Sequence, residues 1–457
     1  MYTGGLRMIN NVSMVFNSTG MATRINATFS PAVTKKVESV LPAAIHEFTE
    51  RSGKKGQFLN WAGLPVQQLK RVDEIYDLVR QLKGQTDAKM LTVLGIGGSK
   101  HTIEHMLGIN GLNIMGDKVK FFSDIDSTSF NRYMYQIGND VKNSNCLVVS
   151  KSGSTFETKD GMMRVLNQLT AKFNPSGVLP KTAGEIAGKY MVAVTDANAE
   201  KSELRKLSDS QGWLGNLYIH DDVGGRFSAL DDQALFTLAY AGMKKEDMIS
   251  MLQGAQYTSS QAISTGMRWN QPIMQAAFWA AAKLDGIKNG VHQYLGEVFN
   301  STEKWHAQMQ NESVKDTSKQ IAKITDAMHH SSEAWYKLGN KFAFALTAPI
   351  DKGVARENVE GYIGAIEKTN SEYGPSMVEM LETKGLGLAP KSAGAMTQAR
   401  AFSTVYQEII EKLALGEPLP EVLSSVLQPN VEAYKKNLKP IEGNQPPVVA
   451  GRISLNA

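Results

Sequence analysis

The stretch MLTVLGIGGSKHT, residues 90–102, decides the fold. Its first residues are apolar or β-branched, as in a buried strand, and the glycines after them form a tight turn. Ser99 stands where a helix would then begin. This stretch therefore predicts a buried strand that turns directly into a helix.

Four further runs of the same kind follow along the chain. Each is apolar and β-branched, and each ends in Gly, Ser, Asp or Thr, where the next helix would begin: VKFFSDID (119–126), NCLVVSKSGS (145–154), YMVAVTD (190–196) and LYIHDDVGG (217–225). Alternation of strands and helices predicts a parallel sheet covered on both faces, although the order of the strands cannot be read from it. Ligands of such sheets lie beyond the carboxyl ends of the strands, so the polar strand ends are the candidate sites.

The flanking regions predict helices and a second sheet. Apolar residues at three- and four-residue spacing indicate helices over about 30–85 and 233–285, whereas 291–299 and 341–349 are typical strands. Further helices are expected at about 355–367, 392–414 and 429–437. We therefore predict an α/β protein with these parts: an N-terminal tail and helical segment (1–60), a first domain (61–245), connecting helices (246–285), a second domain (286–440) and a C-terminal tail (441–457).

Composition excludes several classes of protein. The chain has 457 residues, of which 42% are hydrophobic and 21% charged, which is average for a globular protein long enough for at least two domains. The net charge is only +4, and no long run of Lys or Arg favours nucleic acid as a partner. The sequence contains no apolar stretch of about 18 residues for a membrane helix. A single cysteine, Cys146, excludes an internal disulfide and favours a reducing compartment.

Three strand ends carry residues that suit an anionic ligand. In LGIGGSKHT (94–102), glycines let an anion approach the backbone at a helix N-terminus, although a plain tight turn or a dinucleotide-type turn has the same look. In SKSGSTFET (150–158), the ammonium group of Lys151 and four hydroxyl groups suit a phosphate monoester. The hydroxyl groups belong to Ser150, Ser152, Ser154 and Thr155. The alternative there is helix capping by Ser154 or Thr155. In DDVGGRFSAL (221–230), Arg226 can stabilise negative charge on oxygen, unless it forms a surface ion pair with Asp221 or Asp222.

Together these motifs resemble the glucose-6-phosphate isomerase (phosphoglucose isomerase) family. The order and spacing of GIGGS, SKSGSTFET and GGRFS match the first sugar-isomerase domain of that family. QNESVKD (310–316) is similar to its GESxGK stretch, and LQPNVEAYKKNL (427–438) to its second signature. The resemblance covers about residues 60–440 and implies two sugar-isomerase (SIS-type) domains, each a parallel sheet flanked by helices. The chain departs from the usual pattern at Asn430, where glycine is common, and after Glu312, where a glycine is missing.

The resemblance also implies a reaction, the interconversion of glucose 6-phosphate and fructose 6-phosphate through a cis-enediolate. Glu312 matches the base, and Arg226 matches the arginine that stabilises the enediolate. Ring opening falls to a histidine and to Lys435. The histidine is His330 if Gly339 aligns with the glycine after the family histidine, and His329 if the register slips by one.

The phosphate group of the substrate has its own set of residues in the family. The residues of this chain that match it are Gly98, Ser99, Ser150, Lys151, Ser152, Thr155 and Gln428. Neither a metal nor an organic cofactor is required. The family implies a cytoplasmic, glycolytic and gluconeogenic homodimer with the active site at the subunit interface, without nucleic acid or membrane as partner. Two alternatives stay open: a bifunctional phosphoglucose/phosphomannose isomerase, and a regulator that binds the sugar phosphate without turning it over.

Overall fold

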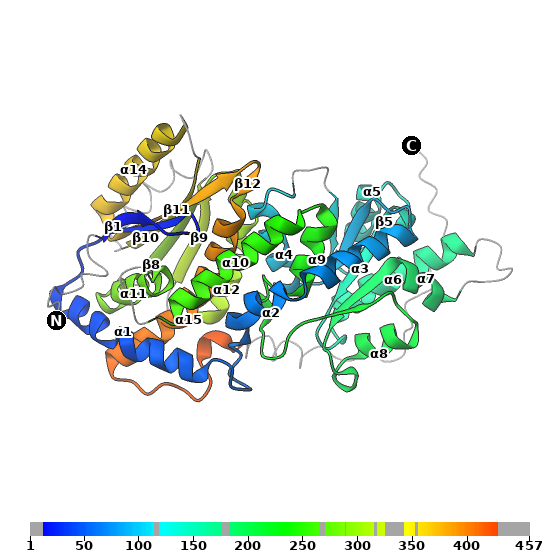
Figure 1. Cartoon of the computed structure of the whole chain (residues 1–457), viewed down its shortest axis with the longest axis horizontal. Helices are drawn as coiled ribbons and strands as arrows, with labels where there is room; N and C mark the ends of the chain where they lie inside the picture. The colour runs from blue at the N-terminus through cyan, green and yellow to red at the C-terminus, as the bar shows by residue number, and fades with distance from the viewer. Residues whose placement is uncertain are drawn as a thin grey trace. The chain divides into compact units, whose positions relative to one another are not determined.

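The first sheet has five strands, and all of them are parallel (Figure 1). This computed structural model describes residues 12–113, 118–174, 182–264, 270–287, 289–314, 318–324, 342–351 and 355–427. The strands lie in the order β4 (Val119–Phe122), β3 (Met90–Leu94), β5 (Ser144–Val149), β6 (Met191–Thr195) and β7 (Asn216–Tyr218). All five predicted strands of this region are thus confirmed, and the structure adds their order.

Helices cover both faces of this sheet, as the alternation predicted. Alternate strand residues point to opposite faces, so Val93 and Leu147 pack in one apolar cluster and Leu94 and Val148 in another. The first face is covered by α3 (Val72–Gln85), α4 (Gly98–Ile109) and α9 (Asp232–Ala241). The second face is covered by α5 (Ser127–Gln136), α6 (Phe156–Phe173), α7 (Ala183–Tyr190) and α8 (Glu203–Ser210).

The second sheet has a parallel centre and an antiparallel edge. Its order is β1 (Val12–Phe16), β2 (Met21–Asn26), β11 (Ser376–Lys384), β10 (Phe342–Ile350), β8 (Asn289–Leu295) and β9 (Ser318–Ile324), with β12 (Gly387–Leu388) paired to β11. The strands β11, β10, β8 and β9 are parallel, whereas β2 runs antiparallel to β11 and β1 antiparallel to β2. Helix α14 (Ala355–Tyr373) packs on one face of this sheet.

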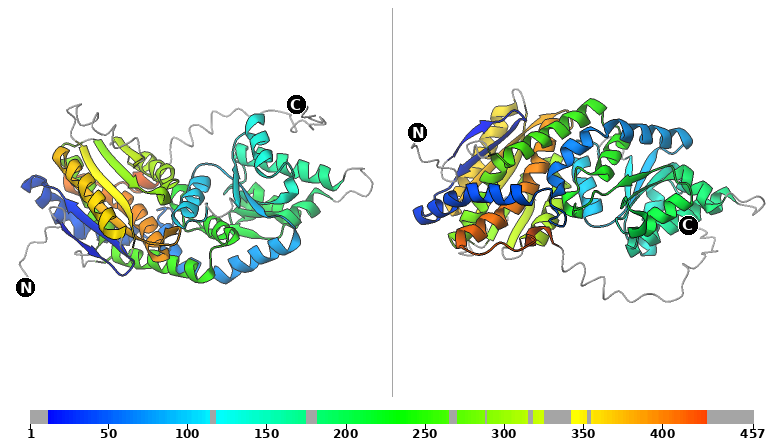
Figure 2. Two further views of the ribbon diagram at one scale, coloured as in Figure 1. Left: turned by 90° about the horizontal axis from the view of Figure 1, so that it is seen from above. Right: turned by 60° about the horizontal axis from the view of Figure 1, so that its bottom comes forward.

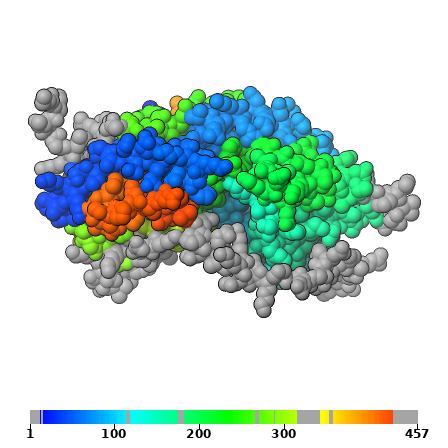
Figure 3. Space-filling model, turned by 90° about the horizontal axis from the view of Figure 1, so that it is seen from below, coloured from blue at the N-terminus to red at the C-terminus, as the bar shows by residue number. Residues whose placement is uncertain are grey.

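The other face of the second sheet carries the helices that join it to the first sheet. The long helix α15 (Pro390–Leu415) is buried along most of its length and packs against α1 (Pro31–Arg51), α10 (Lys245–Ala262) and α11 (Gln271–Leu284). Figure 3 shows the blue surface that includes α1 beside the orange surface of the chain near residue 410 and after it. Because one apolar cluster contains residues from both sheets, the chain through Leu427 forms a single compact unit.

One stretch differs from the prediction, and a second cannot be compared with it. Residues 1–60 were expected to form a tail and a helical segment, but β1 and β2 in this stretch are strands at the edge of the second sheet (Figure 2). The sequence of β2 does not look like a buried strand, because it contains the charged Arg24. In the structure Arg24 forms an ion pair with Glu367 of α14, and no local sequence pattern reveals this distant partner. The expected helix at 429–437 lies outside the described residues, and the domain boundaries remain a prediction. In the described part of the chain, no helix is both long and apolar enough to cross a bilayer.

A buried ion pair fixes α15 against the second sheet. The side chains of Arg400 and Glu379 are each 2% exposed and contact one another directly. The guanidinium also donates to Gln275 Oε1 (2.8 Å) and Thr347 Oγ1 (2.7 Å), and Gln275 donates to Glu379 Oε1 (2.6 Å). Both side chains are removed from water, so the charge of Arg400 is stabilised mainly by Glu379 and the charge of Glu379 mainly by Arg400.

We expect Arg400→Met to lower the free energy of unfolding by about 3–5 kcal/mol, since it leaves the Glu379 carboxylate buried without its cation. The double variant Arg400→Met/Glu379→Leu should recover a large part of that loss, because it removes both charges. Lys384→Ala, which breaks the exposed pair with Asp247, serves as the control and should change stability by less than about 1 kcal/mol. Urea unfolding of the variants would measure these differences. A double variant no more stable than Arg400→Met would contradict the explanation.

Candidate active site

Three loops follow strands of the first sheet at its carboxyl edge. The loop after β3 contains the glycines of LGIGGS, the loop after β5 contains the hydroxyl-rich stretch, and the loop after β7 contains Arg226. Carboxyl ends of parallel strands meet at one edge of a sheet, so the three sequence motifs share that edge. The motifs were chosen from separate parts of the sequence, and the sheet brings them to one place.

The first loop makes a close approach that only glycine permits. Gly97 has φ +55° and immediately precedes helix α4, a backbone conformation that L side chains rarely adopt. A Cβ atom on Gly98 would lie 2.7 Å from the main-chain nitrogen of Arg226. The absence of side chains thus lets the loop after β3 pack directly against the loop after β7. Ser99 follows in the first turn of α4.

The second loop is held together by its own hydroxyl groups. Ser150 Oγ donates to Thr155 Oγ1 (3.2 Å) and accepts from the main-chain N–H of Gly153 (3.1 Å), and the hydroxyls of Ser152 and Ser154 lie 2.7 Å apart. The alternative of helix capping is wrong for these residues, because no side chain in the described chain caps α6 at Thr155. The N–H groups of the first turn of α6 therefore have no capping side chain and can face an anion.

Lys151 extends from the second loop to the third. Its Nζ lies 3.3 Å from the main-chain oxygen of His220, just beyond the end of β7. The main-chain oxygen of Lys151 accepts from Thr195 Oγ1 (3.1 Å), which fixes the backbone from which the side chain extends. Lys151 is partly exposed and belongs to the same loop as the hydroxyl residues, so its side chain is available to an anion bound there.

Arg226 lies at the centre of the site and is completely buried. Its Nε donates to Ser313 Oγ (3.0 Å), and Nη2 donates to the main-chain oxygens of Ser425 (2.6 Å) and Leu427 (3.3 Å). Among the described residues Nη1 has no hydrogen-bond partner, but it lies 3.5 Å from Glu312 Oε2. The ion pair that the sequence analysis considered, with Asp221 or Asp222, is replaced by this one. Burial lowers the pKa of Arg226 to about 10, against the opposing effect of Glu312, so the guanidinium stays charged at neutral pH.

Glu312 belongs to the last turn of α12 (Thr302–Ser313), which packs against α4. Its side chain is 28% exposed, and Oε1 accepts a hydrogen bond from Gln308 Nε2 (3.0 Å) one helical turn earlier. Trp305 of the same helix donates from Nε1 to the main-chain oxygen of Arg226 (2.9 Å). Helix α12 thus carries Glu312 itself and, through Trp305, also fixes the backbone of Arg226. The sequence analysis missed Gln308, although its i, i+4 spacing to Glu312 was a usable signal.

Four of the predicted site residues and alternatives cannot be placed. His329, His330, Lys435 and Gln428 lie outside the described residues. The structure brings Arg226 into contact with Glu312 and with the backbone of Gly98. The predicted phosphate residues of the second loop, which are Ser150, Lys151, Ser152 and Thr155, lie together at the same sheet edge.

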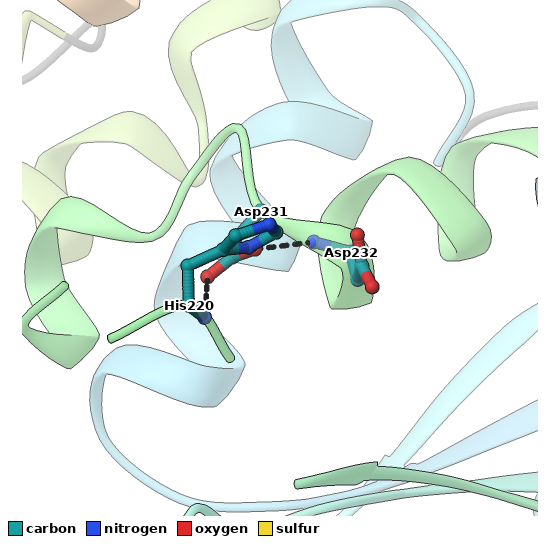
Figure 4. A group of neighbouring side chains, drawn as sticks. All are labelled: His220, Asp231 and Asp232. Carbon is teal, nitrogen blue, oxygen red and sulfur yellow. Dashed lines mark hydrogen bonds and ion pairs between the residues drawn. The ribbon is translucent and has the colours of Figure 1, made fainter. Parts of the chain in front are cut away.

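A second group of ionisable side chains lies at the two ends of the third loop, where β7 leads into it and α9 begins (Figure 4). In the described part of the chain, His220, Asp231 and Asp232 are the group whose potential metal ligands fall within 4.8 Å of one another. Protein donors already occupy the two carboxylates, because Arg71 donates to Asp232 and Gln68 donates to both. We therefore describe this group as a hydrogen-bond network.

The arrangement can combine two chemical tasks. A carboxylate that faces a buried guanidinium can accept a proton while the cation stabilises the negative charge that forms on oxygen. Hydroxyls, an ammonium group and the start of a helix can hold a phosphate group nearby. A phosphorylated substrate with an acidic C–H bond suits both.

Comparison with known proteins gives a consistent result. The model of the phosphoglucose isomerase family matches residues 66–349. A glucose-6-phosphate isomerase from Streptococcus pneumoniae is 24% identical in an alignment 439 residues long, which covers 90% of this chain and 92% of that protein. One from Mycoplasma capricolum is 28% identical in an alignment 420 residues long, which covers 86% of this chain and 92% of that protein. The crystal structure of a glucose-6-phosphate isomerase from Chlamydia trachomatis superposes with a TM-score of 0.71, at 16% identity, over 92% of this chain and 88% of that one, and shows the shared fold.

The contact of the two glycine loops gives a test of the site's construction. We expect Gly98→Ala to lower the free energy of unfolding by about 1–3 kcal/mol, because the new methyl group would press on the main chain of Gly225 and Arg226. Gly84→Ala is the matched control, since open space surrounds Gly84 in helix α3 and alanine should stabilise that helix by about 0.5–1 kcal/mol. Thermal unfolding would compare them. Equal stability of the two variants would show that the loops do not need this contact.

Proposed function

The chain belongs to the phosphoglucose isomerase family, and on this premise we propose that it interconverts glucose 6-phosphate and fructose 6-phosphate. The observation that carries the proposal is the pair formed by Arg226 and Glu312. Their side chains come from different parts of the sequence. Nη1 of the fully buried guanidinium has no hydrogen-bond partner among the residues that the structure describes, and it lies 3.5 Å from Glu312 Oε2. A purely structural arginine would be expected to have all its buried donors satisfied.

Glu312 would act as the base. The reaction moves one proton from C2 to C1 and one hydroxyl proton from O2 to O1 of the open-chain aldose phosphate, so the substrate neither gains nor loses electrons. Glu312 removes the proton from C2 of the aldose, a cis-enediolate forms, and the same carboxyl group returns a proton to C1. The hydrogen bond from Gln308 and the helix α12 hold the carboxylate in place for both steps.

Arg226 would stabilise the enediolate. Negative charge appears on the substrate oxygens as the C–H bond breaks, and a cation already fixed by Ser313 and by the main chain needs no reorganisation to meet it. Removal from water strengthens this interaction, because the effective dielectric constant around a buried charge is lower than in bulk water. The charge of Arg226 persists at neutral pH, as the reaction requires.

The phosphate group would bind at the second loop. Ser150, Ser152 and Thr155 offer hydroxyl donors, Lys151 offers a positive charge, and Gly98 and Ser99 begin the neighbouring helix α4. Gln428 is a further candidate by resemblance. Phosphate binding lies away from the reacting carbons, so its binding energy can hold the sugar in a reactive pose.

Ring opening is assigned by resemblance alone, to His330 with Lys435. The homodimer and the cytoplasmic location are likewise predictions that follow from the family. Mannose 6-phosphate would be an additional substrate if the chain were the bifunctional isomerase.

We expect purified protein to convert fructose 6-phosphate to glucose 6-phosphate, followed through a coupled NADP-dependent dehydrogenase. Glu312→Gln should lower kcat by at least about a thousandfold with little change in KM, because it removes the base and keeps the shape. Glu303→Gln, at the other end of α12, is the control and should keep the parent's activity. Turnover that survives in Glu312→Gln would mean that another carboxylate is the base. A parent that binds the sugar phosphate saturably without turnover would support the regulator instead.

The two adjacent histidines can be separated by paired variants. We expect His330→Asn to lower turnover of the cyclic substrate by at least about a hundredfold, since general acid–base catalysis contributes about that much, while His329→Asn should stay near the parent. Both variants would be assayed with fructose 6-phosphate at saturating concentration. The reverse result would shift the register by one residue and assign His329 to ring opening.

A further inference from the structure

His220 and Asp231 stand at the two ends of the loop that carries Arg226. His220 follows the last residues of β7, and Asp231 immediately precedes helix α9. The tip of the loop between them contains Gly225 and Arg226. Any contact between residues 220 and 231 therefore closes the loop at its base and limits how far Arg226 can move.

One buried carboxylate makes this contact twice. Asp231 Oδ2 accepts from the main-chain N–H of His220 (3.1 Å), and Oδ1 lies 2.6 Å from His220 Nδ1. Figure 4 shows the two side chains facing one another, with the carboxylate of Asp232 turned to the other side. Asp231 has no exposed surface, whereas the His220 side chain is 22% exposed. The position of the carboxylate is fixed in turn by the main-chain N–H of Asp232 (2.9 Å) and by Gln68 (3.3 Å).

The same histidine connects this loop to the phosphate loop. Its main-chain oxygen accepts from Lys151 Nζ (3.3 Å) and from the main-chain N–H of Val223 (3.3 Å). The main-chain N–H of His220 thus donates to Asp231, and the main-chain oxygen of the same residue accepts from Lys151. Nothing else that the structure describes joins the lysine of the second loop to the loop of Arg226 in this way.

We propose that His220 and Asp231 form a positioning pair, which closes the Arg226 loop and fixes the carbonyl that orients Lys151. The pair would act through these two residues and would not touch the substrate. The inference rests on the proposed function, in which Arg226 stabilises the enediolate and Lys151 binds the phosphate group. It extends that function to two residues that none of the sequence motifs indicated.

The charges around His220 give the pair a dependence on pH. Burial lowers the pKa of His220, but the hydrogen bond and charge of Asp231, with the charge of Asp232 behind it, outweigh burial and raise the pKa above its usual value. Arg71, which pairs with Asp232, acts in the opposite direction. Lys151 is the cation on the carbonyl side, and Asp221 and Asp222 follow in the loop itself.

The sign of the effect follows from the direction of the shift. A raised pKa means that the folded loop favours protonated His220, so the ionic part of the pair is fully present below the ordinary histidine pKa of about 6.5. It is lost as the pH rises through the raised pKa. Above that pH, the neutral imidazole still donates from Nδ1 to Asp231, so a weaker contact remains.

The test compares the parent with His220→Asn and His220→Ala. Asparagine places an amide donor near the position of Nδ1 but cannot carry charge, and alanine removes the contact. For His220→Ala we expect kcat/KM for fructose 6-phosphate at pH 6.5 to fall at least about tenfold, and the Kd for inorganic phosphate, measured by calorimetry, to rise in parallel. For His220→Asn the parent-to-variant ratio of kcat/KM should decrease as the pH rises from 6 to 9. His46→Asn, an exposed histidine on α1, is the control and should give a flat ratio.

The outcomes separate the inference from the proposed function. The ratio between two enzymes cancels the titration of the substrate phosphate, because both meet the same substrate. A flat ratio for His220→Asn, or an unchanged phosphate Kd in His220→Ala, would overturn the pair. If His220→Ala fails to fold, the pH dependence of the His220→Asn ratio decides alone. A parent without turnover would contradict the proposed function, and the phosphate affinities of parent and His220→Ala would then decide whether the pair positions Lys151.

Discussion

The burial of the Arg226 guanidinium is the constraint on which the site depends. A charged group without contact with water is tolerated only where acceptors replace the lost solvent. Here the acceptors come from Ser313 at the end of α12 and from the main chain at residues 425–427, while the loop itself packs against Gly98. Segments more than 300 residues apart in sequence (Gly98 and Ser425) must therefore meet before the arginine can be buried. The fold that brings them together is also what leaves Nη1 directed at Glu312.

The second buried arginine shows what a purely structural solution looks like. Arg400 is as deeply buried as Arg226, but Glu379 contacts it directly and Gln275, Thr347 and Tyr294 accept its remaining donors. In Arg226 the carboxylate stays at 3.5 Å and one nitrogen has no hydrogen bond among the described residues. The same residue type thus occurs in two electrostatic settings in one chain. Arg226, whose hydrogen bonds are incomplete among the described residues, is the arginine that lies in a sequence motif. This coincidence supports a functional interpretation of Arg226.

The sequence predicted the first sheet well because each strand there is continuously apolar and ends in residues that favour turns. It predicted the second sheet only in part. Strand β11 carries Glu379 at its buried centre, and β2 carries Arg24, so neither shows an uninterrupted apolar run. The partners that make these charges tolerable, Arg400 and Glu367, are distant in sequence. The site shows the same limit in part: motifs indicated Arg226, Glu312 and the hydroxyl loop, whereas the contacts between His220 and Asp231 follow from the tertiary structure. Gln308 is different, because its i, i+4 spacing to Glu312 is visible in the sequence.

The hydrogen bonds of the hydroxyl loop differ from those of a helix cap. Threonine at Thr155 could cap α6, yet its hydroxyl accepts from Ser150, and the first N–H groups of the helix have no side-chain partner in the described structure. A cap would typically stabilise the helix by about 1 kcal/mol. Hydrogen bonds among hydroxyls are readily exchanged for bonds to phosphate oxygens, and charge-assisted bonds of that kind are roughly twice as strong as neutral ones. The loop thus lacks the stabilisation that a side-chain cap would give, and a phosphate group bound as proposed would supply acceptors for the first N–H groups of α6.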